Sequence, residues 1–360
     1  MKVNLDISPA LINKTAVYRL VLDYGDALIE RCELSLSVCG KVVASNITPG
    51  EFISSIKGQR KSALVKVVND YFTNKYSMDA PVAKDECVNI YLDPAYIPKS
   101  RKLLSNDYIV IHDLTTYTNP HWHSKTVRQR YKRAFSDIAE SEGNIISDSE
   151  STSSELYFHF CISKKRISTL PLYLVRSFNQ KEFNSPAKKT MLFVGNLEAR
   201  KNLLGLLKGF QISELNRLGY ILEIVGMNGH GSCEILDHGK KIDGIHFNGF
   251  ISEKKLKNMY LNCFGFCYPS FWEGFGMPLL EAMSYGCVCL STLTGASPEI
   301  GGDAVIYCDP YRPESIAAGL LTIHALSSEQ RSFLSNRAFK RSQNFTAKKY
   351  FEKLLSILGI

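Results

Sequence analysis

Two glutamates in one short segment, Glu273 and Glu281, stand out as a pair that could do chemistry together. They belong to PSFWEGFGMPLLE, in which Glu273 precedes two glycines and Pro278 stands between the glutamates. Proline favours the first position of a helix, so Glu273 should lie in a loop and Glu281 one turn inside the helix. Two carboxylates facing one cleft accept protons from paired hydroxyls, which suits a ligand with vicinal diols, such as a sugar or a ribose. Alternatively, Glu281 only stabilises the positive end of its helix.

A pair of cations, Arg200 and Lys201, follows a strand-like run that ends at Gly195. A helix is predicted to begin at Asn202, and positive side chains directly before a helix oppose its dipole. A phosphate held between the helix start and Lys201 would compensate for this repulsion. If nothing binds there, the two cations are simply exposed on the surface.

The length and composition of the chain fit two globular domains. It has 360 residues, of which 45% are hydrophobic and 22% charged, which excludes a disordered, fibrous or repetitive protein. No apolar run approaches the ~20 residues needed to cross a bilayer. The opening MKVNLDISPALINK lacks the apolar stretch of a secretion signal. We therefore expect a cytoplasmic protein.

Strand-like and helix-like segments alternate along both halves of the chain. In the first half the expected strands are Val3–Ile7, Leu34–Val38, Cys87–Leu92, Asp107–Ile111, Asn144–Ser147 and Pro171–Val175, with helices over Val17–Arg31 and Lys125–Glu140. In the second half the expected strands are Met191–Val194, Ile221–Val225, Ile245–Phe247, Phe264–Tyr268, Cys287–Ser291 and Ala304–Tyr307. The helices expected there are Asn202–Ile212, Glu253–Leu261, Pro278–Tyr285 and Pro313–Ala325. Apolar strands alternating with helices predict parallel sheets covered on both faces.

This alternation predicts an α/β fold of two Rossmann-like domains that face a central cleft, with ligands at the carboxyl ends of the strands. We place the first domain at residues 1–178, a polar linker at 177–189 and the second domain at 190–345. A final helix, within 346–360 and capped by Thr346, is expected to pack back toward the first domain.

The cysteines and the glycine-rich segments give little sign of metal or redox chemistry. Five of the ten cysteines lie in apolar, strand-like runs, and no C-x-x-C occurs, so we expect small buried thiols. These five are Cys263, Cys267, Cys287, Cys289 and Cys308. No D-x-D is present either, so we predict that no metal is needed. The segment GMNGHG has its glycines in the wrong order for a dinucleotide site and is interpreted as a loop near the nucleotide.

Two basic clusters lie in the first half. One comprises Lys57, Arg60, Lys61 and Lys66, and the other Lys125, Arg128, Arg130, Lys132 and Arg133. They are either solvated helix faces or surfaces that approach an anionic membrane. Neither is interleaved with aromatic residues as in single-strand nucleic-acid binders, so we expect no nucleic acid.

Taken together, GNLEARKNLLGLLKGF and PSFWEGFGMPLLEAMSYGCVCLSTLTGASPEIGGDA resemble the nucleotide-sugar domain of glycosyltransferase family 4, whose members are retaining enzymes of the GT-B fold. The first half resembles the family more weakly, in DISPALINKTAVYRLVLDYGDAL, IVIHDLTTYTNP and IISDSESTSSEL. By motif the chain is most similar to bacterial mannosyltransferases that build O-antigen, capsule or other surface polysaccharides.

The resemblance implies a role for each matching position. Lys201 and Arg200 would neutralise the donor diphosphate, Glu281 would hold the ribose, and His112 would touch the sugar near its reacting face. Glu273 would hold the sugar hydroxyls with the backbone of Gly274, Phe275, Gly276 and Met277. The strand-ending Gly195 and its neighbour Asn196, the loop at Thr15 and Ala16, and the backbone at Phe250 and Ile251 would complete the donor site. Two positions depart from the family, because Ala16 replaces a glycine and Asn196 an arginine.

The activity implied is transfer of a hexose, from a GDP- or UDP-linked sugar and without a cofactor, to a saccharide or lipid-linked saccharide acceptor. GDP-mannose is the donor favoured by the resemblance. A nucleotide-sugar epimerase on the same fold, which would need no acceptor, and an inactive sugar-binding scaffold are the alternatives. Acceptor-dependent release of nucleotide diphosphate would distinguish the transferase from both.

Overall fold

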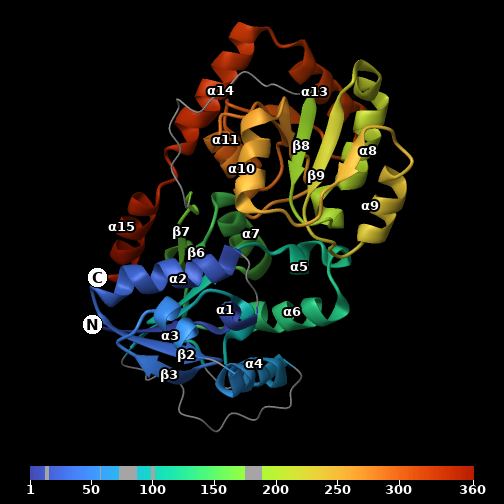
Figure 1. Cartoon of the computed structure of the whole chain (residues 1–360). Coiled ribbons are helices and arrows are strands. Elements are labelled where there is room, and N and C mark those ends of the chain that lie inside the picture. Colours follow the sequence, from blue (N-terminus) through green and yellow to red (C-terminus); the bar gives the residue numbers. More distant parts are fainter. Residues whose placement is uncertain (13–15, 57, 73–86, 99–101, 175–188) are drawn as a thin grey trace. The chain divides into compact units, whose positions relative to one another are not determined.

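The computed structural model describes residues 1–12, 16–56, 58–72, 87–98, 102–174 and 189–360. These residues form two compact units (Figure 1). The first unit contains Met1–Pro120, Lys125–Leu170 and Phe351–Ile360, and the second contains His121–Ser124 and Pro171–Tyr350. Most of the predicted linker, 177–188, lies outside the described residues, so its place stays a prediction.

The first unit is built on a seven-stranded sheet with the order β3-β2-β1-β4-β5-β6-β7. Its strands are β1 (Lys2–Asp6), β2 (Glu33–Val38), β3 (Lys41–Ser45), β4 (Val88–Tyr91), β5 (Asp107–Ile111), β6 (Asn144–Ser147) and β7 (Ile167–Thr169). All neighbours pair in parallel except β2 and β3, which form an antiparallel hairpin. Cys39 (φ 49°) and Gly40 (φ 81°) make its tight turn.

The helices of the first unit connect these strands. They are α1 (Ser8–Ile12), α2 (Ala16–Ile29), α3 (Pro49–Ser55), α4 (Gly58–Phe72), α5 (Thr115–Thr118), α6 (Lys125–Ala139) and α7 (Glu150–Phe160). The end of α15 (Ala347–Leu358) also belongs to this unit. There the Phe351 ring packs edge-on against Tyr24, with the ring centres 5.9 Å apart, and Tyr108 donates a hydrogen bond to the Ile357 carbonyl.

A row of buried polar side chains crosses four strands of the first sheet. The Asn4 amide donates to Ser37 Oγ (3.1 Å) and to Asn89 Oδ1 (3.2 Å), and the Asn89 amide donates to Asp107 Oδ1 (2.8 Å). All four side chains are buried, so a slipped strand would leave several polar groups unpaired. This row therefore fixes the register of β2, β1, β4 and β5.

The second unit has a six-stranded, fully parallel sheet with the order β10-β9-β8-β11-β12-β13. Its strands are β8 (Thr190–Val194), β9 (Ile221–Val225), β10 (Ile245–Phe247), β11 (Gly265–Cys267), β12 (Cys289–Thr292) and β13 (Ile306–Cys308). Because β8 and β11 are neighbours although far apart in sequence, the loops that follow them meet at the carboxyl edge of the sheet.

Helices cover both faces of this sheet. They are α8 (Leu203–Ile212), α9 (Ser232–Gly239), α10 (Glu253–Asn262), α11 (Met277–Ser284), α12 (Ser297–Gly301), α13 (Pro313–Ala325), α14 (Ser328–Ser342) and the start of α15. In Figure 1, α8 and α9 lie on one side of β8 and β9, and α10 and α11 on the other. Apolar side chains from the strands and both helix layers form one continuous core.

The structure confirms the expected α/β fold with two largely parallel sheets and corrects several details. A strand was predicted over Pro171–Val175, but residues 171–174 do not form one, and Val175 lies outside the described residues. Leu174 instead makes an isolated bridge to Thr346, and the last strand of the first sheet is β7. The antiparallel strand β3 was missed because Cys39-Gly40 is not one of the usual hairpin sequences. Thr346 does cap α15, since Lys349 N donates to Thr346 Oγ1 (3.4 Å).

The five cysteines predicted to be buried thiols are indeed buried and free. Among the helices that the structure describes, none is long and apolar enough to cross a membrane.

Candidate active site

The two cations of the site are carried by a tight turn after β8. Arg200 and Lys201 lie in a 3-10 turn, Ala199–Lys201, and α8 begins at Leu203 rather than at Asn202 as predicted. Asn202 instead adopts a left-handed conformation (φ 54°), and its side-chain amide donates to the carbonyls of Pro269 (3.0 Å) and Pro310 (2.7 Å). These bonds fasten the turn to the loops after β11 and β13.

Glu273, in the loop after β11, is ion-paired with both cations. Its Oε2 lies 2.8 Å from Arg200 Nη1 and its Oε1 lies 2.9 Å from Lys201 Nζ. Arg200 Nη1 also donates to the Trp272 carbonyl (2.9 Å). Both Glu273 and Lys201 are buried. The structure thus brings together three residues that the sequence analysis assigned to different parts of one ligand.

Burial and charge act in opposite directions on these groups. Burial alone would raise the pKa of Glu273, but Arg200 and Lys201 outweigh it and lower that pKa to about 2. Burial lowers the pKa of Lys201, and the charge of Glu273 opposes this effect. Glu273 is therefore a carboxylate throughout the physiological pH range, and the three side chains together carry a single net positive charge when Lys201 is protonated.

Tyr268, which the sequence analysis took only as the end of a buried strand, supplies a third partner for Lys201. Lys201 Nζ donates to the Tyr268 hydroxyl and lies 4.9 Å from the centre of its ring. Tyr268 is fully buried and packs against Phe193 and Phe266. The backbone holds it as well, because its carbonyl accepts a hydrogen bond from Ser291 Oγ (3.1 Å). A rigid hydroxyl therefore fixes the position of the lysine ammonium.

The segment after β12, which contains Gly295 and Ala296, packs against the backbone of the Glu273 loop. Ala296 N donates to the Glu273 carbonyl (2.9 Å). Gly295 has φ 56°, and a Cβ atom there would lie 2.4 Å from the Glu273 carbonyl oxygen. Only glycine satisfies both the backbone conformation and this close approach. Gly295 is a second residue of the site whose role sequence analysis missed.

The glycines after Glu273 lead directly into α11. Gly276 is the N-cap, in a left-handed conformation (φ 103°), so the helix begins at Met277 and Pro278 is its second residue rather than its first. Phe275 is buried and packs edge-on against Phe345, with a centre distance of 5.9 Å. The free N–H groups of this helix start lie directly after the Glu273 loop, as the anion- or hydroxyl-binding hypothesis requires.

Glu281 lies in α11, and Tyr260 of α10 holds it in place. The Tyr260 hydroxyl donates to Glu281 Oε2 (3.2 Å), and the Tyr260 and Tyr285 rings stack with their centres 5.0 Å apart. Burial raises the pKa of Glu281, whereas the bond from Tyr260 lowers it. No cation pairs with Glu281 among the described residues, which leaves its other oxygen for a neutral hydroxyl donor.

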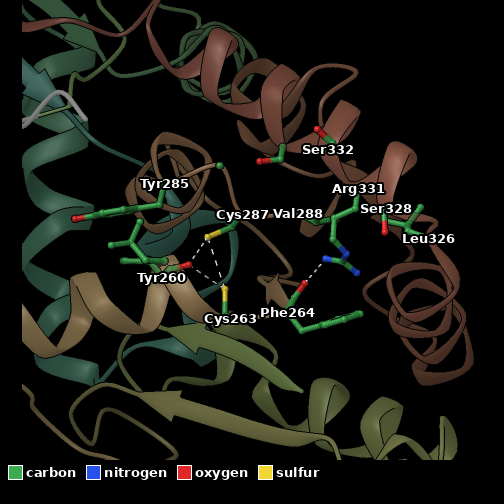
Figure 2. A pocket seen from close by; sticks show the side chains of 13 residues that line it. Tyr260, Cys263, Phe264, Tyr285, Cys287, Val288, Leu326, Ser328, Arg331 and Ser332 are labelled. Atoms are coloured by element: carbon green, nitrogen blue, oxygen red, sulfur yellow. Dashed lines mark hydrogen bonds between the residues drawn. The ribbon is translucent and has the colours of Figure 1, made fainter. Parts of the chain in front are cut away.

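Tyr260 also borders a cavity of about 390 Å³ at the amino ends of β11 and β12 (Figure 2). Two thiols donate hydrogen bonds to the Tyr260 carbonyl there, Cys263 Sγ at 3.4 Å and Cys287 Sγ at 3.2 Å. The two sulfur atoms lie 3.7 Å apart. Burial raises the pKa of Cys287 well above its usual value, so this thiol is an unreactive packing group.

The other predicted donor-site positions occupy the loops at the same edge of the sheet. Gly195 follows β8, and its N–H donates to the Val225 carbonyl (2.9 Å), while the Asn196 amide donates to Glu198 (3.4 Å). Phe250 follows β10 with 82% of its surface exposed, and Ile251 packs on the core. Thr15 and the side chain of Ala16 lie outside the described residues.

His112 follows β5 in the first unit and is held by both ring nitrogens. Nδ1 lies 2.6 Å from Asp148 Oδ2, and Nε2 lies 3.1 Å from the Leu92 carbonyl, which can only accept. Burial lowers the pKa of His112, but the charge and hydrogen bond of Asp148 outweigh it and raise the pKa to about 9. His112 is therefore an imidazolium at neutral pH with both N–H groups already donated.

Replacing Tyr268 with phenylalanine should weaken anion binding by about tenfold, since a hydrogen bond to a charged group contributes about 1.5–3 kcal/mol. The matched control is Tyr220→Phe, which removes another buried hydroxyl, bonded to His324 at 2.9 Å. We expect both variants to lose thermal stability, but only Tyr268→Phe to lose affinity for inorganic pyrophosphate in calorimetry. Equal pyrophosphate affinity in the two variants would contradict the role of Tyr268.

Asp148→Asn should lower the pKa of His112 from about 9 toward its ordinary value, because the substitution removes the main charge that raises it. Since the folded pKa lies above the unfolded one of about 6.5, the charged ring stabilises the fold below that pH. This contribution is lost as the pH rises through 9. An NMR titration of the imidazole measures the shift, with Asp137→Asn as the control for an exposed acid of α6. An unchanged titration in Asp148→Asn would contradict this account.

The comparisons with known proteins agree with the geometry. Residues 175–341 match the family described as Glycosyl transferases group 1. The chain is 28% identical over 246 residues to the O-antigen chain mannosyltransferase B of Escherichia coli, covering 64% of each chain. The chain thus spans less than two thirds of the length of this curated relative.

Two solved structures share the fold across the whole chain. The Anabaena protein Alr3699/HepE, in complex with UDP and glucose, superimposes with a TM-score of 0.67 at 13% identity and covers 100% of this chain and 99% of its own. WaaG, a glycosyltransferase involved in lipopolysaccharide biosynthesis, gives a TM-score of 0.65 at 13% identity, with 99% of both chains covered. At such identities the likeness is one of fold, and it confirms the GT-B class. Residues 175–341, slightly less than half of the chain, are thus similar to the glycosyl transferases group 1 family.

Proposed function

We propose that the chain is a retaining hexosyltransferase that moves a hexose from a nucleotide diphosphate sugar to a hydroxyl of a growing polysaccharide or a lipid-linked saccharide. The observation that carries this proposal is the ion-paired group of the buried Lys201 and Glu273 and the half-buried Arg200 at the carboxyl edge of the second sheet. These three groups leave one positive charge, which the half-buried Glu198, 3.9 Å from Arg200, offsets in part and which an anionic leaving group can neutralise in its place.

Each charged group has a distinct part in this proposal. Lys201, assisted by Arg200, faces the diphosphate, and Glu273 accepts hydrogen bonds from the sugar hydroxyls together with the loop Gly274–Met277. Glu281, which Tyr260 orients, accepts the hydroxyls of the ribose. Because Glu273 already pairs with both cations, its charge stays compensated whether or not the donor is bound.

The chemistry is the exchange of one bond at the anomeric carbon. The bond to the diphosphate oxygen breaks, the acceptor oxygen bonds on the same face, and its proton passes to the departing phosphate. The protein's main contribution is to stabilise the negative charge that develops on the diphosphate. His112 would approach the sugar through its positive charge and the carbon edge of its ring, since both of its N–H groups are donated elsewhere.

The name of the curated relative supports mannose as the hexose, and we propose GDP-mannose as the donor. The solved neighbour that holds UDP makes UDP-linked sugars the comparison to include. The test is to incubate the protein with GDP-mannose, UDP-glucose or UDP-N-acetylglucosamine, with and without an oligomannose acceptor and with EDTA present. Release of nucleotide diphosphate only when acceptor is present supports the transferase, and conversion of the sugar without release would replace it with an epimerase. Full activity in EDTA is the result expected from the predicted independence of metal.

Lys201→Ala should lower turnover by about 10²–10³-fold, the usual effect of removing one strong stabiliser of developing charge. Lys340→Ala, which removes an exposed lysine of α14, is the control and should leave turnover unchanged. Turnover is measured at saturating donor, so that weaker binding does not obscure the effect. Near-native turnover of Lys201→Ala under these conditions would disprove the phosphate assignment.

We propose further that the first unit binds peripherally to an anionic membrane surface on the cytoplasmic side. In α6 the side chains of Lys125, Lys132 and Arg133 are exposed, and in α4 those of Lys61 and Lys66 are. Arg128 and Arg130 are half-buried, while Lys57 and the side chain of Arg60 lie outside the described residues. Basic side chains near an anionic surface contribute about 1 kcal/mol each, and salt screens them.

The membrane proposal predicts reversible, salt-sensitive binding. The protein should sediment with vesicles containing about 30% phosphatidylserine at low ionic strength, and it should be released near 0.5 M salt, where the Debye length is only a few ångströms. Lys132→Glu combined with Arg133→Glu should weaken this binding, whereas Lys254→Glu combined with Lys255→Glu in the second unit should not. If no binding occurs even at low salt, both clusters are solvated helix faces.

A further inference from the structure

A second cavity, separate from the one in Figure 2, lies at the carboxyl edge of the second unit. Its volume is about 360 Å³, and the first turns of α8, α9 and α13 surround it. Ala199 and Asn202 line it, so it borders the turn that carries Arg200 and Lys201. Its size falls within the range of about 300–1,000 Å³ that is typical of sites for small molecules.

Aromatic rings form one wall of this cavity. Phe271 and Tyr311 pack with their ring centres 5.1 Å apart, and Trp122 stacks on Phe271 with the centres 6.1 Å apart and the planes 12° apart. Trp122 belongs to the segment His121–Ser124, which is part of this unit. Tyr311 has 71% of its surface exposed, so ring surface is available to a ligand.

Two opposite charges stand among the remaining lining residues. Lys208 of α8 and Glu234 of α9 both line the cavity and are exposed. Within the described part of the chain, neither of them forms an ion pair. Their side-chain charges cancel, so these two residues add no net charge to the cavity. It does offer one strong donor and one strong acceptor of hydrogen bonds.

The walls of the cavity are held rigidly. The Asn202 amide bonds to the carbonyls of Pro269 and Pro310, next to Tyr311. The helices α8 and α13 approach closely, because a Cβ atom at Gly209 would lie 2.8 Å from Ile316. A preformed cavity binds its ligand without a large ordering penalty.

We propose that this cavity binds a neutral saccharide unit of the acceptor chain, as a binding site additional to the donor site. A pyranose ring presents C–H groups on its face, which pack on aromatic rings, and hydroxyls at its edge, which bond to groups such as Lys208 and Glu234. The inference deepens the proposed function and rests on it for the identity of the sugar. Its consequence is that long acceptors are held more tightly than short ones.

The test compares Tyr311→Ala with wild type in the binding of α-mannotetraose and maltotetraose, measured by calorimetry. Tyr311 is exposed, so the substitution should not unfold the protein. We expect wild type to bind at least one of the two tetrasaccharides, and Tyr311→Ala to bind it roughly tenfold more weakly. Tyr311→Phe keeps the ring and should bind like wild type. Phe333→Ala removes an exposed ring of α14 and is the matched control that should change nothing.

Tetrasaccharide binding tests the cavity, and nucleotide diphosphate binding tests the donor site. If neither tetrasaccharide binds, or if Tyr311→Ala binds as tightly as wild type, the saccharide site is disproved. Equal losses in Tyr311→Ala and Phe333→Ala would disprove it as well. Nucleotide diphosphate affinity, measured on the same variants, tests the donor site separately and should be unchanged in all of them.

Discussion

Burying Glu273 together with Arg200 and Lys201 is the constraint around which the second unit is organised. A carboxylate and two cations are each costly to remove from water, and they are tolerated only when their charges and hydrogen bonds are mutually satisfied. The surrounding residues meet this requirement one by one. Tyr268 accepts a further N–H of Lys201 and the Trp272 carbonyl a further N–H of Arg200, and Gly295 allows Ala296 to fasten the loop. The close approach of β8 and β11 makes the arrangement possible.

The two glutamates of the site, Glu273 and Glu281, have different surroundings, which shift their pKa values in opposite directions. Glu273 is kept ionised by two cations, whereas Glu281 has an aromatic hydroxyl as its partner and a raised pKa. The interaction of Glu273 with its two cations depends on any charge that a ligand brings near them, whereas Glu281, in a neutral and buried setting, is suited to accept hydrogen bonds from hydroxyls. This contrast agrees with assigning Glu273 to the part of the donor that reacts and Glu281 to the part that does not.

Sequence analysis identified the fold class and the charged residues because both depend on local patterns. Strand ends followed by glycines and helix starts place Arg200, Lys201 and Glu273 at one edge of a parallel sheet without further information. The supporting residues depend on contacts between distant elements, which no local pattern reveals. Tyr268 looks like any apolar strand residue, and the bond from His112 to Asp148 joins two separate loops.

The placement of Phe351–Ile360 in the first unit has a consequence for how the chain folds as it is made. The Phe351 ring packs against Tyr24, and the Ile357 carbonyl accepts a hydrogen bond from Tyr108. Phe351 and Ile357, however, leave the ribosome only after the entire second unit. Domains usually fold in the order of synthesis. Here the first unit must wait, with part of its apolar surface exposed, while the second unit completes its core. The earlier half of the chain is thus expected to reach its final form last.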